Sequence, residues 1–118
     1  MATRLEQLAE AVLARRALEA RSLVQEMVRA GLIGELVEPA TADPPVRVVA
    51  AALAELLAGR HALPAPEWTS RVGPLSEPFF AVERALRWPR LREECEREAP
   101  EPLRRRAIYA PAGFLTYA

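Results

Sequence analysis

The sequence has no lysine and no asparagine, and it contains only one cysteine, one histidine and one aspartate. Without lysine, the chain can build neither a P-loop phosphate site nor a Schiff base. The single cysteine, Cys95, excludes an internal disulfide. Cys95, His61 and Asp43 are also too few to form a chelating cluster of histidine and cysteine. We therefore expect no metal site, no cofactor and no catalytic residues, and we expect that the protein is not an enzyme.

An excess of charge is also missing, because 16 arginines balance 16 acidic residues and the formal net charge is zero. No global field would draw such a protein to nucleic acid or to an anionic membrane, so any electrostatic recognition must be local. No apolar run approaches the roughly 20 residues that span a bilayer. The first residues do not resemble a signal peptide, so the sequence predicts a cytoplasmic protein that does not bind membranes.

Hydrophobic residues make up 51% of the 118 residues, which is enough for one core, and we expect a single helical domain over residues 1–118. No alternating run is long enough for a central strand. The predicted fold is all-α: a compact multi-helix domain with a proline-rich connector and an irregular, aromatic C-terminal tail. Its predicted core joins seven residues, which are Leu5, Leu8, Val12, Val49, Leu53, Leu56 and Phe80.

The first helix is predicted from a capping box, in which the Thr3 side chain accepts from the backbone of Glu6. Hydrophobic residues then recur at helical spacing until Gly31, which is a stop signal. One continuous helix would place Arg16 on the apolar stripe. The sequence therefore allows either one long helix or two helices with a break at residues 15–18.

The next helix has the clearest pattern in the chain. Asp43 is a candidate cap, and Pro44 suits a first turn, where a missing N–H group has no effect on the hydrogen bonding. Residues 46–57 carry a wide apolar face, and Gly59 stands where a glycine would end the helix.

Residues 63–78 contain four prolines and form the predicted connector, with Trp68 expected to attach it to the core. A further helix is predicted to enter at Pro78 and to carry Phe79 and Phe80.

The dipeptide Trp88-Pro89 predicts a break, followed by a second, charged helix with Leu91 and Cys95 facing inward. A short helical turn is expected at residues 103–106, and the tail beyond it is expected to be extended or irregular.

The tail is the most informative segment for function, because three adjacent arginines lead into five large apolar residues near the chain end. Chain ends are usually polar, so an apolar tail must be buried in its own domain or docked on a partner. We expect binding rather than a reaction. The candidate partner-binding residues are Trp68, Trp88, Arg104, Arg105, Arg106, Tyr109, Phe114 and Tyr117.

The arginine triplet Arg104 to Arg106 has two interpretations. The guanidinium groups could bind phosphates or carboxylates bidentately, with Tyr109 and Phe114 as stacking surfaces for single-stranded nucleic acid. Alternatively, they hold the tail in place by pairing with the acidic stretch before it, which is Glu93, Glu94, Glu96, Glu98 and Glu101.

Two further patterns, a cysteine–histidine dyad and a helix-turn-helix, have less support in the sequence than the C-terminal tail. A Cys95–His61 dyad would need both side chains in one cleft, whereas the simpler interpretation is a buried cysteine and a surface histidine beside a helix end. A helix-turn-helix would use residues 18–27 or 46–57 as the recognition helix, but the second of these is mostly Ala, Val and Leu.

Residues 64–118 also resemble a loose set of small prokaryotic proteins. The matching features are the segment Pro64-Ala-Pro-Glu-Trp-Thr69, the pair Phe79-Phe80 and the ending Pro-Leu-Arg-Arg-Arg-Ala-Ile-Tyr-Ala-Pro-Ala-Gly-Phe-Leu-Thr. The resemblance implies an antitoxin-like role, as the partner of a toxin-like nucleotidyltransferase in a two-gene system. The chain departs from a typical antitoxin because it has no obvious DNA-binding half.

Two classes of function follow from the sequence. The first is a non-catalytic protein-binding module, and the second is a nucleic-acid-binding regulatory protein that acts through its arginine-rich C-terminal third. The expected partner is a protein, with nucleic acid and a homo-oligomer as the alternatives.

Overall fold

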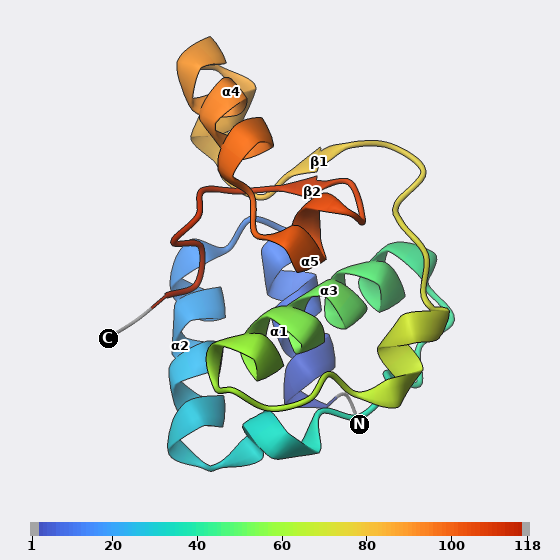
Figure 1. The fold of residues 1–118 in the computed structure, drawn as a ribbon. Helices are drawn as coiled ribbons and strands as arrows, with labels where there is room; N and C mark the ends of the chain where they lie inside the picture. Colours follow the sequence, from blue (N-terminus) through green and yellow to red (C-terminus); the bar gives the residue numbers. More distant parts are fainter. Residues whose placement is uncertain (1–2, 117–118) are drawn as a thin grey trace.

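Helices make up most of the structure, a computed structural model that describes residues 3–116. That part of the chain has five α-helices, three 3-10 helices and two short strands, which confirms the mostly helical fold that the sequence predicts. The α-helices are α1 (Arg4–Leu13), α2 (Ala17–Arg29), α3 (Pro44–Arg60), α4 (Pro89–Glu98) and α5 (Glu101–Arg104). The other elements are the 3-10 helices η1 (Leu32–Glu35), η2 (Glu67–Arg71) and η3 (Glu83–Leu86), and the strands β1 (Phe79–Phe80) and β2 (Ile108–Tyr109). In Figure 1, α1, α2 and α3 pack together on one side of the strands, and α4 lies on the other side.

The N-terminal segment forms two helices rather than one. Helix α1 starts as predicted, because the backbone N–H of Glu6 donates to Oγ1 of Thr3 at 3.1 Å. The helix ends when Arg15 adopts a left-handed conformation with φ of 57°, and the N–H of Arg16 donates back to the carbonyl of Ala11. The break keeps Arg16 exposed at the surface instead of on the apolar stripe.

Helix α3 runs through the centre of the core. It begins with Pro44 as predicted, and its end lies at Arg60, one residue beyond the expected glycine stop. The left-handed residue that closes this end is Ala62, with φ of 56°. Helices α1 and α5 and the 3-10 helix η2 all contact α3, so its side chains are enclosed on several sides.

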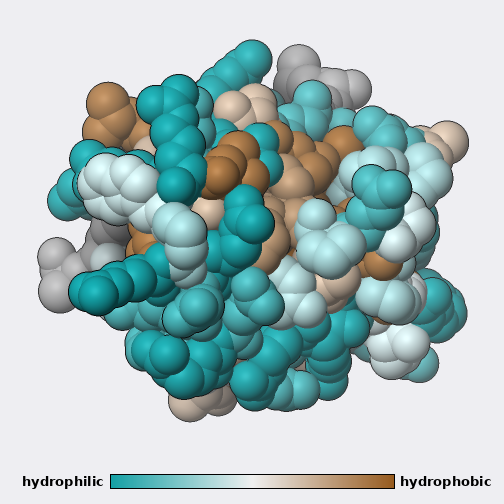
Figure 2. All heavy atoms as spheres, turned by 90° about the horizontal axis from the view of Figure 1, so that it is seen from above, coloured by the Kyte–Doolittle hydropathy of each residue, from teal (hydrophilic) through white to brown (hydrophobic). Residues whose placement is uncertain are grey.

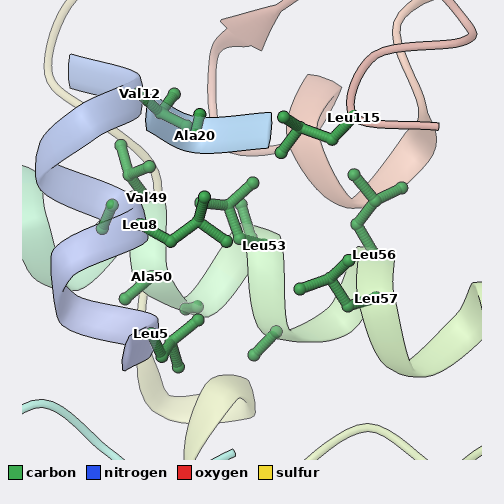
Figure 3. Close-up of a cluster of buried hydrophobic side chains, with 14 of the residues drawn as sticks. Leu5, Leu8, Val12, Ala20, Val49, Ala50, Leu53, Leu56, Leu57 and Leu115 are labelled. Carbon is green, nitrogen blue, oxygen red and sulfur yellow. The ribbon is translucent and has the colours of Figure 1, made fainter. Parts of the chain in front are cut away.

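The core confirms six of the seven predicted positions, and Figure 3 shows them on α1 and α3, with Leu56 on the side of α3 that is away from α1. Leu115 of the C-terminal segment points into the same cluster. Each fully buried leucine contributes about 1.5 to 3 kcal/mol relative to an exposed one. The seventh position, Phe80, is half-buried and lies outside this cluster, so its prediction was wrong.

The segment around Phe79 and Phe80 is a strand, which corrects the predicted helix. Strand β1 pairs in parallel with β2, and the N–H of Phe79 donates to the carbonyl of Ala107 at 2.8 Å. The N–H of Ala81 donates to the carbonyl of Tyr109 in the same way. The pairing partner is far away in the sequence, so local periodicity could not reveal it.

The proline-rich connector is not irregular throughout, because η2 forms within it. Trp68 of η2 is buried, and its indole N–H donates to the carbonyl of Leu36 at 3.0 Å. A buried indole N–H needs such an acceptor. This contact attaches the connector to the chain after η1.

Helix α4 packs mainly against η3 and follows the predicted break at Trp88-Pro89. Cys95 is its one residue classed as buried, and Leu91, also predicted to face inward, is half-buried. Among residues 3–116, no helix is both long and apolar enough to cross a membrane.

Candidate functional site

The three adjacent arginines point to different surroundings. Arg104 is exposed and pairs with Glu101 at 2.9 Å, one of the acidic residues considered in the sequence. Arg105 and Arg106 instead share a carboxylate of α3, that of Glu55. Arg106 is 4% exposed, and its two terminal nitrogens lie 2.6 and 3.1 Å from the two oxygens of Glu55. The acidic stretch is therefore the wrong partner for two of the three arginines.

Glu55 is the residue that the sequence analysis missed. Burial raises the pKa of its carboxyl group, but hydrogen bonds from Arg106, Arg105 and Thr69 outweigh this effect and hold the pKa below its ordinary value. Glu55 therefore stays ionised inside the protein. One signal could have indicated its role, because Glu55 is the only acidic residue in the apolar run 46–57.

The pairing joins three segments of the chain. Arg106 also donates to the carbonyl of Thr69 in η2 at 2.8 Å, while Glu55 belongs to α3. Removing one partner of a buried ion pair leaves the other charge without compensation, which is strongly unfavourable. We conclude that Arg106 holds the C-terminal segment on the core and does not face solvent.

The four aromatic candidates that the structure describes differ in exposure. Trp68 is buried, whereas Trp88 is 56% exposed, and the guanidinium carbon of Arg84 lies 5.7 Å from the centre of its ring. Tyr109 is half-buried, with its ring centre 5.4 Å from that of Phe80. Phe114 is half-buried against the core. Tyr117 lies outside the described residues.

Phe114 borders a groove where three parts of the chain meet. This corner groove has a volume of about 440 Å³ and lies between the α1–α2 corner, the segment after β1 and the C-terminal segment. Its apolar lining consists of Ala11, Val12, Ala17, Ala20, Ala81, Val82, Phe114 and Leu115. Its polar border consists of Arg15, Arg16, Glu83 and Arg84. Figure 2, seen from the side of α4, shows hydrophobic atoms gathered in the middle of a mostly hydrophilic face.

Two residues of the corner groove have left-handed backbone conformations, namely Arg15 with φ of 57° and Leu115 with φ of 59°. This conformation is unfavourable by roughly 1 to 2 kcal/mol for residues other than glycine, and two alanines adopt it away from the groove. Contacts hold Arg15 in place, because its Nε donates to the carbonyl of Phe80 at 2.9 Å. Its guanidinium carbon also lies 4.6 Å from the centre of the Phe79 ring.

The C-terminal side of the groove is fixed from α3. Arg60 donates to the carbonyl of Phe114 at 2.6 Å and to that of Ala112 at 3.3 Å. The bonds fix the backbone beside Leu115, whose side chain enters the core. Hydrogen bonds thus fix the backbone on both sides of the groove, at Phe80 through Arg15 and at Phe114 through Arg60.

Cys95 and His61 occupy different environments. The Cys95 side chain is buried, and burial together with the nearby Glu94, Glu96 and Glu98 raises the pKa of its thiol. His61 is exposed, and its ring nitrogen Nδ1 lies 2.9 Å from the carbonyl of Leu57 at the end of α3. Cys95 thus lies buried in α4 and His61 exposed at the end of α3, which agrees with the simpler interpretation of these two residues.

Comparisons of the chain with protein-family models, with curated proteins and with solved structures give no match. Between residues 3 and 116, no group of three or more His, Cys, Asp or Glu side chains could hold a metal ion. The geometry of the corner groove alone makes it the candidate site.

Proposed function

We propose that this protein is a small, non-catalytic module that binds another protein, and that the corner groove receives an apolar segment of that partner. The observation that carries the proposal is the apolar floor with its arginine border, beside two residues with left-handed backbone. An apolar side chain of the partner would enter the groove, and a neighbouring carboxylate would meet an arginine.

Arg16 is the arginine best suited to meet that carboxylate. It pairs with Glu19 of α2 at 3.4 Å, and both side chains are at least half exposed. Exposed ion pairs of this kind contribute little, typically about 0.2 to 1 kcal/mol, so Arg16 can exchange its partner at little expense in stability. Arg15 is committed to Phe79 and Phe80 and shapes the groove instead.

The arginine triplet supports protein binding over the nucleic-acid alternative. Glu101 already pairs with Arg104, and Glu55 pairs with Arg105 and Arg106. A phosphate backbone would have to compete with these carboxylates. Binding through the corner groove should therefore persist when salt is raised, whereas binding through several arginines to phosphates would weaken steeply.

The resemblance of residues 64–118 to antitoxin-like proteins extends the proposal to a biological role. In that role the chain neutralises the product of a neighbouring gene, a toxin-like nucleotidyltransferase, by binding it. The groove includes Phe114 from the resembling part, together with α1 and α2 from outside it.

The test co-expresses the full chain with the neighbouring gene product and measures the affinity of the purified pair. Ala17→Trp fills the groove from an exposed position, and Ala30→Trp is the matched control because it places the same side chain at an exposed position away from the groove. We expect Ala17→Trp to weaken binding at least about tenfold, or 1.4 kcal/mol, and Ala30→Trp to leave it unchanged.

Equal affinity of the wild type and Ala17→Trp would show that the groove is not the binding site. If no complex forms with the neighbouring gene product, and the chain instead binds single-stranded nucleic acid in a salt-sensitive way, the nucleic-acid-binding function replaces the proposal.

A further inference from the structure

A second hollow lies over the pairing of Glu55 with Arg105 and Arg106. These three residues line it together with residues of the segment 70–74, and we call it the arginine basin. It shares no lining residue with the corner groove. Its volume is about 330 Å³, at the lower end of the roughly 300 to 1,000 Å³ that is usual for small-molecule sites.

The buried arginine of the basin has one donor left over. The two terminal nitrogens of Arg106 donate to both oxygens of Glu55 and also to the carbonyls of Pro102 and Thr69. Its Nε, however, is buried and has no hydrogen-bond acceptor among residues 3–116. A buried N–H group without an acceptor is unfavourable and uncommon in folded proteins, so this one needs an explanation.

The exposed arginine of the basin has more donors left over. The side chain of Arg105 is 53% exposed, and its hydrogen bond within the described part of the chain runs from Nη2 to one oxygen of Glu55. A guanidinium group has N–H donors along two edges, and each edge can meet both oxygens of a carboxylate. Because Nη2 carries two hydrogens and uses one of them for Glu55, one complete edge of Arg105 stays open.

The charges of the basin leave a surplus of one positive charge. Two arginines line it against one carboxylate, and the carboxyl group of Glu55 is ionised because its pKa lies below the ordinary value. A ligand with a single negative charge would compensate the surplus. A dianion would add a second negative charge close to Glu55 and would be repelled by it. The basin therefore favours a carboxylate over a doubly charged phosphate or sulfate.

We infer that the arginine basin binds the carboxylate of a small organic acid with a short apolar chain. The carboxylate accepts from the open edge of Arg105, and the Nε of Arg106 is a further donor on the same side of the basin. Val72 and Pro74 give the basin an apolar wall for the carbon chain. This ligand would join the C-terminal segment to the chain after η2, which goes beyond the protein binding proposed for the corner groove.

A free acid suits the basin better than an acidic side chain of another protein. The Nε of Arg106 is buried, so the carboxylate has to enter a hollow of about 330 Å³ to approach it. A small acid can enter by itself, whereas a side chain brings its own backbone to the entrance. The two sources of a carboxylate are nevertheless separated by the experiment.

The test titrates the full chain with sodium butyrate at constant ionic strength and follows the NMR signals of the arginine Nε groups. We expect the signal of Arg106 Nε to shift and to saturate, because this group gains an acceptor. Butyramide, which has the same carbon chain without the charge, should cause no such shift. Sulfate, a dianion, should bind at least about tenfold more weakly than butyrate.

The arginine triplet supplies its own matched control. Arg105→Gln removes the open edge and should weaken butyrate binding at least about tenfold. Arg104→Gln makes the same change one residue earlier, at an exposed arginine that pairs with Glu101 and does not line the basin, and it should leave the affinity unchanged. Both variants keep the buried pair of Arg106 with Glu55, and thermal unfolding checks that both are folded.

The inference is wrong if butyrate gives no saturable shift at Arg106 Nε, if butyramide acts like butyrate, or if Arg105→Gln binds butyrate like the wild type. It is also wrong if butyrate does not bind while Arg105→Gln weakens the complex with the neighbouring gene product, because the carboxylate then belongs to that partner. A result against the arginine basin leaves the corner groove untouched, because the groove is tested with different residues and a different ligand.

Discussion

Helices α3 and α4 differ in where their stability comes from. Twelve residues of α3 are buried, and its proline in the first turn, its apolar face and its enclosed position all favour the same structure. Helix α4 has one buried residue, Cys95, and carries charges that oppose its own dipole. The comparison teaches that burial on several sides specifies α3, whereas α4 is attached mainly through η3, where Arg92 donates to the carbonyls of Ala85 and Leu86.

The single acidic residue buried in α3 provides the sharpest test of this contrast. Glu55→Ala should lower the free energy of unfolding by about 3 to 5 kcal/mol, because the charge of Arg106 would be left buried without a carboxylate to compensate it. Glu93→Ala in α4 is the matched control and should change it by less than about 0.5 kcal/mol, because Glu93 is exposed. Urea denaturation followed by circular dichroism measures both values. Similar losses in the two variants would contradict the difference between the helices.

A second, smaller effect concerns the pH dependence of stability. The pKa of Glu55 in the folded protein is lowered from its ordinary value of 4.5, so its contribution is fully present above that value. This contribution is lost as pH falls through the lowered pKa, because the folded state must then take up a proton. The variant to compare with the wild type is Glu55→Gln, because glutamine cannot ionise at this position.

The unfolding free energies of the wild type and of Glu55→Gln should therefore differ at pH 7 and converge as pH falls below 4.5. Denaturation curves at a series of pH values give this difference directly. A difference that stays constant down to the acid transition would show that Glu55 is not ionised in the folded protein.

The smallest expected effect concerns the residues at the C-terminal ends of α3 and α4. Helix α3 is closed by Ala62 with φ of 56°, and glycine adopts this conformation without the steric penalty of a Cβ atom. Ala62→Gly should raise the free energy of unfolding by about 0.5 to 1 kcal/mol. Ala99 at the end of α4 has φ of −56°, so Ala99→Gly should give no such gain. Thermal unfolding checks both variants, and a loss of stability in Ala62→Gly would show that its Cβ makes a contact worth more than the strain.

The helices were predictable where their signals are local. The cap at Thr3 and the apolar spacing of α3 depend on neighbours within one or two turns, and both predictions are confirmed. The break near Arg16 was left open because spacing alone does not show where a left-handed residue will fall. The structure resolves it at Arg15.

The errors concern contacts between distant parts of the chain. The local sequence around Phe79 and Phe80 is compatible with either a strand or a helix. The strand forms because it pairs with β2, which follows almost thirty residues later. The partner of Arg106 lies 51 residues earlier, in a helix that otherwise looks purely apolar. The candidate site could be anticipated only through Phe114, because the corner groove is formed by segments that meet after folding.

The distance between Glu55 and Arg106 also affects how the chain matures during synthesis. Ribosomes add about 5 to 20 residues per second, so Glu55 is made roughly 3 to 10 seconds before the arginine that neutralises it, which follows 51 residues later. During this time α3 carries a charge that opposes its burial, and the core cannot close completely around it. Compensation of the Glu55 charge therefore has to wait for the segment that carries Arg106. A chain cut short before Arg106 would keep an uncompensated charge in its central helix, which marks it for removal by the quality-control machinery of the cell.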